Sequence, residues 1–174
     1  LKPLLDYLLN NQMPDGGFNC QSPRKGANHS SLHTTLSVLE GLHEFRKNGY
    51  KYRSSEIIEI ESKCIEFILQ HRLYKSDKTG KVINPNFTRM PYPPRWKYDI
   101  LRCLDFFQYA KIPYDERMRD AIELVLSKKR KDGTWPVQAK HPGEVYFDME
   151  KTGQASRMNT FRVLKVLKEY GEFL

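Results

Sequence analysis

Two short stretches decide the fold: Gln12-Met13-Pro14-Asp15-Gly16-Gly17-Phe18 and a weaker copy, Lys129-Arg130-Lys131-Asp132-Gly133-Thr134-Trp135. In each stretch an apolar run ends, an Asp-Gly pair follows, and an aromatic residue comes two positions after the first glycine. Glycine accepts the positive φ that such a turn needs, and the aromatic side chain can fold back onto the element just left. The sequence therefore predicts the same turn twice, each time between two helices.

The spacing between matching residues predicts a repeat protein. The two turns align at a shift of 117 residues, and the helices that follow them align at a shift of 125, while a shift of 65 relates a middle segment to the first. These shifts bring together Asp15 and Asp132, Thr35 and Thr160, and Leu36 and Leu101. Three helix-loop-helix units result, at about residues 1–49, 50–111 and 112–174. One unit cannot bury both of its apolar faces, so the units must stack side by side.

Six amphipathic segments predict helices and make the chain all-α. They cover about residues 3–12, 32–48, 54–70, 96–109, 115–128 and 156–170, and the expected N-caps include Ser30 or Ser31, Ser54 or Ser55, and Asp115. In the third helix we expect Ile57 and Ile58 to face inward, and in the last helix Met158, Phe161, Val163, Leu164, Val166 and Leu167. The segment Val145-Tyr146-Phe147 is too short and isolated to predict a strand.

Composition limits the partners only broadly. The 174 residues include 29 Lys and Arg against 21 Asp and Glu, a net charge of +8 that favours anionic partners. The basic residues are spread along the chain, so nucleic acid is not the expected partner. Three distant cysteines indicate no disulfide or zinc site, and no apolar run is long enough for a membrane span. We therefore expect a cytoplasmic protein, and the missing initiator Met suggests an excised piece.

The pattern Gln12-x-x-x-Gly16-x-Phe18 resembles the Gln-Trp repeat of squalene-hopene and oxidosqualene cyclases. Their α/α-toroid fold is shared with the β subunits of protein prenyltransferases. The third unit departs from the pattern because Lys129 stands where the glutamine belongs. Two further segments, Arg89–Leu101 and Gly153–Thr160, are similar to an uncharacterised bacterial branch of this superfamily. The resemblance implies an α/α toroid with a central cavity for an apolar small molecule.

The catalytic motifs of the superfamily are missing from the sequence. It contains no Asp-x-Asp-Asp, which protonates the alkene in squalene-hopene cyclases, and no Asp-Asp-x-x-Asp for magnesium. No Asp lies two residues before Cys20, Cys64 or Cys103, as the zinc site of the prenyltransferases requires. The fold resemblance therefore carries no mechanism, and catalysis is left open. Three hairpins also make at most half a ring, which a second copy or more of a longer chain would have to complete.

The repeat alignment places one group of polar and aromatic residues at the N-terminal turns of the second helix in each unit. As ligand-binding candidates it gives Tyr92, Arg95, Trp96, Arg157 and Asn159, and as catalytic candidates Asp99, Tyr98 and His33. Helix N-termini, arginines and aromatic rings in one cavity suit an apolar molecule, with or without an anionic group. The alternative is structural: Arg95 and Asp99 form an i, i+4 salt bridge within a helix, and Trp96 and Tyr98 are packing residues.

Two other patterns are weaker. His29 and His33 have a spacing that can hold a metal, but no third ligand is evident, so we expect neither a metal nor a cofactor. Asp148 and Glu150 could be paired carboxylates for acid-base chemistry, yet in a basic protein we expect them to partner Lys and Arg.

Three functions fit these observations. The first is a terpenoid-cyclase-like or prenyltransferase-like domain with a cavity for an apolar small molecule. The second is a uronate-cleaving polysaccharide lyase, which requires Tyr98 or Tyr92 within hydrogen-bond reach of His33 and Arg157 in an open cleft. The third is a helical-repeat scaffold without catalysis, which requires a wide, solvated concave surface.

Overall fold

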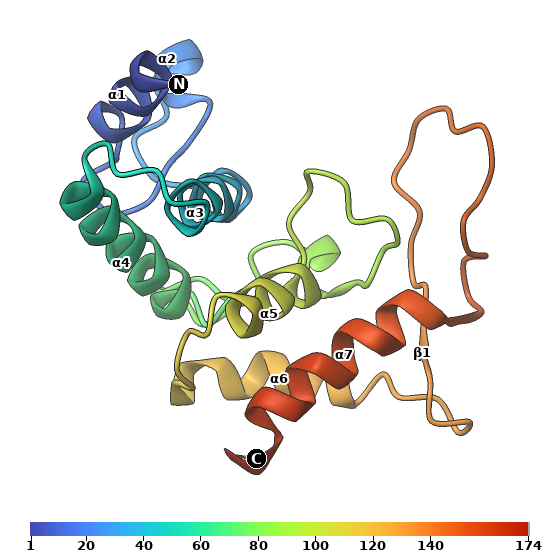
Figure 1. The fold of residues 1–174 in the computed structure, drawn as a ribbon. Coiled ribbons are helices and arrows are strands. Elements are labelled where there is room, and N and C mark those ends of the chain that lie inside the picture. The colour runs from blue at the N-terminus through green and yellow to red at the C-terminus, as the bar shows by residue number, and fades with distance from the viewer. Residues whose placement is uncertain (174) are drawn as a thin grey trace. The chain divides into compact units, whose positions relative to one another are not determined.

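The computed structural model describes residues 1–173 and is predominantly helical (Figure 1). It consists of two compact units, the first from Leu1 to His71 and the second from Arg72 onward. The prediction of three stacked repeats in part of a toroid stays a prediction, and the two observed units are described one at a time.

The first unit contains four helices, α1 (Lys2–Asn10), α2 (Ser22–Lys25), α3 (Leu32–Lys47) and α4 (Ser54–Gln70). Helix α4 packs against α3 and α1. Pro3 lies in the first turn of α1, where its missing N–H has no helical partner to lose. Leu5 and Leu9 of this helix are buried, so one stripe of α1 forms its contact with the core. The short α2 was not predicted from the sequence.

The first Asp-Gly turn is closed by two backbone hydrogen bonds. The N–H of Gly16 donates to the carbonyl of Met13 at 2.9 Å, and the N–H of Met13 donates to that of Gly17 at 2.9 Å. Gly16 has a φ of 90°, as the turn prediction required. Phe18 is buried behind the turn, and its N–H donates to Oγ1 of Thr35 at 2.9 Å. This bond joins the turn to the first turn of α3.

Helix α4 begins differently from the prediction. Its N-cap is Arg53 in a left-handed conformation, whereas Ser54 lies within the helix. The prediction that Ile58 faces inward is also wrong, because its side chain is 52% exposed while Ile57 is buried. A helix turns by about 100° per residue, and at this position the turn carries Ile58 away from the core that Ile57 meets.

The second unit is built around α5 (Ile100–Tyr109), α6 (Arg119–Leu126) and α7 (Arg157–Tyr170). Three short 3-10 helices accompany them: η1 (Pro85–Thr88), η2 (Glu116–Met118) and η3 (Gly171–Phe173). Strands β1 (Trp135–Pro136) and β2 (Ala155–Ser156) form an antiparallel pair with Trp135 opposite Ser156, which the sequence did not predict. Helix α7 packs against α5, and α5 against α6, so the core of this unit lies among these three helices.

The fourth helix begins four residues later than the sequence predicts, because α5 starts at Ile100 and not at Trp96. Asp99 is its N-cap, with Oδ1 accepting from the N–H of Arg102 at 2.9 Å. Arg95 precedes the helix in a left-handed conformation, with a φ of 53°. The proposed helical salt bridge between Arg95 and Asp99 is therefore wrong. Asp115 is confirmed as a cap, although of η2, where it accepts from the N–H of Arg117.

The second Asp-Gly turn has the same backbone bonds as the first. The N–H of Gly133 donates to Arg130 at 3.0 Å, and the N–H of Arg130 donates to Thr134 at 2.8 Å. Trp135 is buried, its N–H donates to Oγ1 of Thr160 at 2.9 Å, and its indole N–H donates to the carbonyl of Val125 at 2.7 Å. The aromatic ring thus packs back onto α6, the helix just left.

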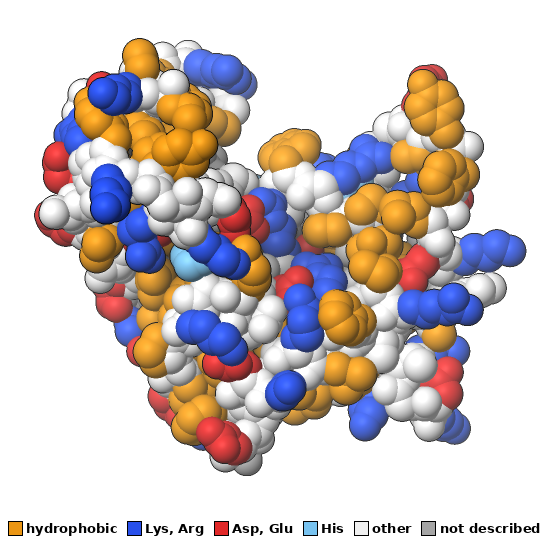
Figure 2. All heavy atoms as spheres, viewed as in Figure 1, with side chains coloured by type: hydrophobic (Ala, Val, Ile, Leu, Met, Phe, Trp, Pro, Cys, Tyr) orange, Lys and Arg blue, Asp and Glu red, His pale blue; other side chains and the backbone are white. Residues whose placement is uncertain are grey.

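Helix α7 has apolar residues on two faces, and only one of them is buried. Val163 and Val166 lie in the core, whereas Met158, Phe161 and Leu164 are 40%, 58% and 53% exposed, so the prediction that these three face inward is wrong. Figure 2 shows hydrophobic side chains gathered over α7 and over the loop that precedes it.

Candidate functional site

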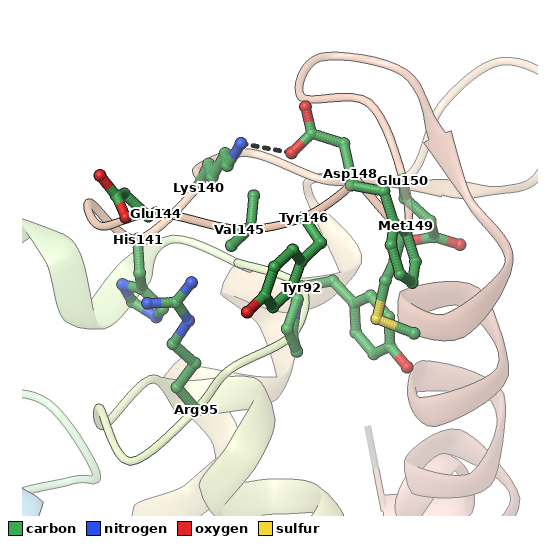
Figure 3. A pocket seen from close by; sticks show the side chains of 12 residues that line it. Tyr92, Arg95, Lys140, His141, Glu144, Val145, Tyr146, Asp148, Met149 and Glu150 are labelled. Carbon is green, nitrogen blue, oxygen red and sulfur yellow. Dashed lines mark ion pairs between the residues drawn. The ribbon is translucent and has the colours of Figure 1, made fainter.

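A pocket of about 290 Å³ lies in the second unit, between the segment that leads into α5 and the loop between β1 and β2 (Figure 3). Its apolar and aromatic wall consists of Tyr92, Pro93, Val145, Tyr146, Phe147 and Met149. Its polar groups belong to Arg95, Lys140, His141, Glu144, Asp148 and Glu150. An apolar wall with a few polar groups is the usual composition of a small-molecule site.

Backbone pairing holds the two walls together. Pro91 and Ala139 form a parallel bridge, and the N–H of Gln138 donates to the carbonyl of Met90 at 3.1 Å. The side-chain amide of Asn159 donates to the carbonyls of Met90 at 3.0 Å and Pro136 at 3.1 Å. Asn159 is completely buried, so these bonds form away from water. Its role is therefore to tie both walls to the start of α7.

Arg95 and His141 lie together at one end of the pocket, where Figure 3 shows the guanidinium beside the imidazole ring. Nη1 of Arg95 donates to the carbonyl of Pro142 at 3.4 Å, which turns the side chain toward the loop. Nε2 of His141 is buried without a hydrogen-bond partner among the described residues. A buried polar atom without a partner is costly, and such atoms often mark a place for a ligand or water.

Burial lowers the pKa of His141, and the nearby charges of Lys97 and, to a smaller extent, Arg95 lower it further. A hydrogen bond to the backbone of Pro94 acts in the opposite direction. A lowered pKa means that the ring is mostly neutral at pH 7. The ring nitrogen that bonds the carbonyl of Pro94 then carries the proton, so Nε2 of the neutral ring is a hydrogen-bond acceptor, and it becomes a donor only when the ring is protonated.

Two acidic residues of the loop, Asp148 and Glu150, have partners that give each of them a structural role. Asp148 forms an ion pair with Lys140, drawn across the loop in Figure 3. Glu150 caps α7: its Oε1 accepts from the N–H groups of Arg157 at 2.9 Å and Met158 at 3.2 Å, and Oε2 bonds the hydroxyl of Ser156. A carboxylate is well placed at a helix N-terminus because the backbone N–H groups there lack partners. The expectation that these acids partner basic residues is confirmed for Asp148, whereas Glu150 bonds the backbone at the start of α7.

Of the ligand-binding candidates, the structure brings Tyr92 and Arg95 into the pocket wall. Trp96 is 66% exposed and does not line the pocket. Arg157 lies at the first residue of α7, beside the pocket through the bond from its N–H to Glu150. Asn159 supports the walls from behind.

The catalytic candidates lie elsewhere. The ring of Tyr98 is buried and its hydroxyl donates to the carbonyl of Leu73. His33 lies in the first turn of α3 in the first unit and is not part of this pocket. Asp99 is 1% exposed, and its Oδ2 has no hydrogen-bond partner among the described residues.

Burial raises the pKa of Asp99 to about 6, although the charges of Arg162 and Arg102 and the N–H of Arg102 act in the opposite direction. Arg162 also lies close to this group, with its Nε bonded to Oδ2 of Asp105 at 3.0 Å. The perturbed pKa of Asp99 therefore follows from its position as a buried N-cap in the core, and it is not part of the pocket lining.

Sequence reasoning missed most of the loop from Lys140 to Glu150. The segment Val145-Tyr146-Phe147 was considered only as a strand, for which it is too short, and His141 was given no role. One signal was present: the turns align at a shift of 117 and the following helices at 125, so eight additional residues must lie between Trp135 and α7. Those residues belong to the segment that forms the pocket.

A second pocket, of about 230 Å³, lies in the first unit at the corresponding place after the first Asp-Gly turn. Phe18, Cys20 and Arg24 line it, together with Tyr7 of α1 and Val38 of α3. The hydrogen bond from the N–H of Cys20 to Oγ1 of Thr34, at 3.3 Å, holds its loop against α3. This pocket contains no buried polar atom without a partner among the described residues.

No protein-family model matches the chain, and neither the curated proteins nor the solved structures contain a match. Within residues 1–173 no cluster of three or more His, Cys, Asp or Glu side chains could hold a metal ion. None of the described helices is both long enough and apolar enough to cross a membrane.

Proposed function

We propose that the chain is a domain of the α/α-toroid type that binds an apolar small molecule carrying an anionic group. The observation that carries this proposal is the pocket in the second unit. One wall presents aromatic and aliphatic side chains, and the other end presents the guanidinium of Arg95 beside the unpaired nitrogen of His141. An anion would be held by Arg95 and would favour the protonated form of His141, whose Nε2–H can then donate to it, while the apolar body packs on Tyr92 and Met149.

Two observations support the toroid. The turns at Gly16 and Gly133 are closed by the same pair of backbone hydrogen bonds, and the aromatic residue after each turn donates its N–H to a threonine of the next helix. These equivalences occur at the shifts of 117 and 125 residues that the sequence predicts. A terpenoid-cyclase-like or prenyltransferase-like domain, cytoplasmic and of bacterial type, is the proposal that fits this repeat, and it assigns no reaction to the chain.

The alternative of a uronate lyase has less support. It requires Tyr98 or Tyr92 within hydrogen-bond reach of His33 and Arg157. The hydroxyl of Tyr98 is buried against Leu73, and although Tyr92 lines the pocket, His33 does not. The scaffold alternative requires an open surface without convergent polar groups, whereas Arg95 and His141 converge on one pocket.

The test is calorimetric titration of the chain with octanoate and with octanol, which share an apolar body and differ in charge. We expect octanoate to bind more tightly, and Arg95→Met to weaken octanoate about tenfold while leaving octanol nearly unchanged. Lys131→Met removes an exposed positive charge away from the pocket and serves as the control. If Arg95→Met and Lys131→Met have the same effect, or if neither compound binds, the proposal fails.

A further inference from the structure

The apolar stripe on the exposed face of α7 continues the pocket. Met158, Phe161 and Leu164 recur at intervals of three residues, so they share one face of the helix, and all three are at least 40% exposed. The opposite face of α7 is used for packing against α5. A row of large apolar side chains in contact with water is unfavourable unless something covers it.

The stripe begins at the pocket wall. Glu150 lines the pocket, and the same carboxylate accepts from the backbone N–H of Met158, the first residue of the stripe. Met149, next to Glu150 in the chain, also lines the pocket and is 57% exposed. The pocket lining at Met149 and Glu150 therefore meets the first turn of α7, and the exposed apolar residues of α7 lead on from there. At 1.5 Å per residue, the helix carries the stripe about 9 Å farther, to Leu164.

The charges along this path suit a molecule with an anion at one end. Arg95 lies at the pocket end. Of the acids that line the pocket, Asp148 is paired with Lys140 and Glu150 with the backbone at the start of α7. Along α7 the charged side chains up to Lys168 are all cationic, and the only acid of the helix, Glu169, comes after the stripe. Nζ of Lys165 lies 5.2 Å from the centroid of the Phe161 ring and also pairs with Asp105.

We propose that the pocket and the α7 stripe form one continuous site for an elongated amphiphile of the fatty-acid class. The carboxylate lies at Arg95 and His141, and the hydrocarbon chain passes Met149 and lies along Met158, Phe161 and Leu164. This inference rests on the proposed function, because it uses the same anion-binding end. It adds the length and the direction of the apolar body, which the pocket alone does not define.

The experiment is a chain-length series of octanoate, dodecanoate and hexadecanoate, titrated below their micelle-forming concentrations. We expect the affinity to rise roughly twofold to threefold per added methylene once the chain reaches α7. Phe161→Ser should remove most of the gain for hexadecanoate and leave octanoate unchanged. Leu164→Lys provides a second variant on the stripe, and Tyr109→Ser, at an exposed aromatic of α5, is the matched control. Circular dichroism checks that each variant is folded.

The outcomes separate this inference from the proposed function. If octanoate binds through Arg95 but longer acids gain nothing, or if Phe161→Ser weakens all three acids equally, the continuous site is wrong and the proposed function stands. If the long acid binds through Phe161 without any dependence on Arg95, both are wrong. The inference also fails if Phe161→Ser changes only the oligomeric state in size-exclusion chromatography, since a second copy of the chain or another protein then covers the stripe.

Discussion

The turns at Asp15 and Asp132 have the same backbone bonds but use their carboxylates differently. Asp15 reaches across the loop and accepts from the N–H of Ser30 at 2.7 Å and from its hydroxyl, so it fixes the approach to α3. Asp132 accepts from the N–H of Thr134 at 3.0 Å and from its hydroxyl at 2.6 Å, and so stabilises only its own turn. The carboxylate of the first turn is bonded to a distant segment, whereas that of the second is bonded only within its own turn.

The loops after the two turns show what this difference allows. From Phe18 to the N-cap Ser31 there are 13 positions, and from Trp135 to the N-cap Ser156 there are 21, which is eight more. In the first unit Asp15 holds the shorter loop close to α3. In the second unit Asp132 does not reach the loop. Arg130 bonds the carbonyl of Gly153 at 3.3 Å near the end of the loop, and Glu150 caps α7. The extra length projects from β1 and β2 and forms a wall of the pocket. The same turn thus precedes a short connection in one unit and a longer, pocket-lining loop in the other.

The largest expected effect tests whether the aromatic after each turn has the same role. Phe18→Ala and Trp135→Ala should each lower the free energy of unfolding by about 3 to 5 kcal/mol, because each empties a buried ring site. Trp135→Ala should be the larger of the two, since it also leaves the carbonyl of Val125 without its indole donor. Urea denaturation measures both values. A loss below about 1 kcal/mol at either position would break the equivalence of the two turns.

A smaller effect tests the close packing that is particular to the first turn. A Cβ at Gly17 would lie 2.6 Å from Oγ1 of Thr35 and 2.7 Å from Cβ of Ser30, both shorter than any ordinary contact. Gly17→Ala should therefore cost up to about 3 kcal/mol. The corresponding residue of the second turn already carries a side chain, so Thr134→Ala should cost about 1 kcal/mol, the value of its hydrogen bond to Asp132. Equal losses by denaturation would contradict this contrast.

The threonine that accepts a hydrogen bond from the backbone N–H of each aromatic residue should contribute less again to the free energy of unfolding. Thr35→Val and Thr160→Val keep the shape of the side chain and remove the acceptor for Phe18 and Trp135. We expect a loss of about 1 to 2 kcal/mol for Thr35→Val, because Thr35 is completely buried and the N–H cannot turn to water. Thr160 is only half-buried, so its loss should be smaller. Hydrogen exchange of the Phe18 and Trp135 amides measures this difference. Exchange that is accelerated more at Trp135 in Thr160→Val than at Phe18 in Thr35→Val would contradict the expected order.

The smallest effect distinguishes the two carboxylates by pH. Burial would raise the pKa of Asp15, but hydrogen bonds from the side chain and backbone of Ser30 outweigh it, and the pKa lies below its ordinary 3.8. Its contribution is therefore present above pH 3.8 and is lost as the pH falls below that value. Asp15→Asn should cost less than about 1 kcal/mol at pH 7 and almost nothing near pH 3, because the group is largely solvated.

Asp132→Asn serves as the matched control, and its cost in free energy of unfolding is compared with that of Asp15→Asn at pH 7 and near pH 3. The pKa of Asp132 is also lowered, chiefly by the hydroxyl and N–H of Thr134, but the group is fully exposed to solvent. Its substitution should leave the hydrogen exchange of residues beyond its own turn unchanged, whereas Asp15→Asn should speed the exchange of the Ser30 amide. If both substitutions act only locally, the link from Asp15 to the loop before α3 is not important for stability.

The sequence by itself determined the features that depend on neighbouring residues. Glycine at positions 16 and 133 predicted the turns, and the spacing of apolar residues predicted the helices, because backbone conformation and helical periodicity are local properties. The candidates Tyr92 and Arg95 were also identified from the sequence, and both lie in the pocket wall. The difference between the shifts of 117 and 125 located the longer loop without showing its purpose.

Only the tertiary structure decided what the loop and the helix faces do. Apolar spacing shows that α7 has apolar residues on more than one side, but it cannot say which side meets α5, and so it placed Phe161 inward. The unpaired nitrogen of His141 and the buried carboxylate of Asp99 depend on segments that are distant in the chain. Burial, pairing and pKa are set by such long-range contacts, as between Met90 and Gln138, and no local pattern encodes them.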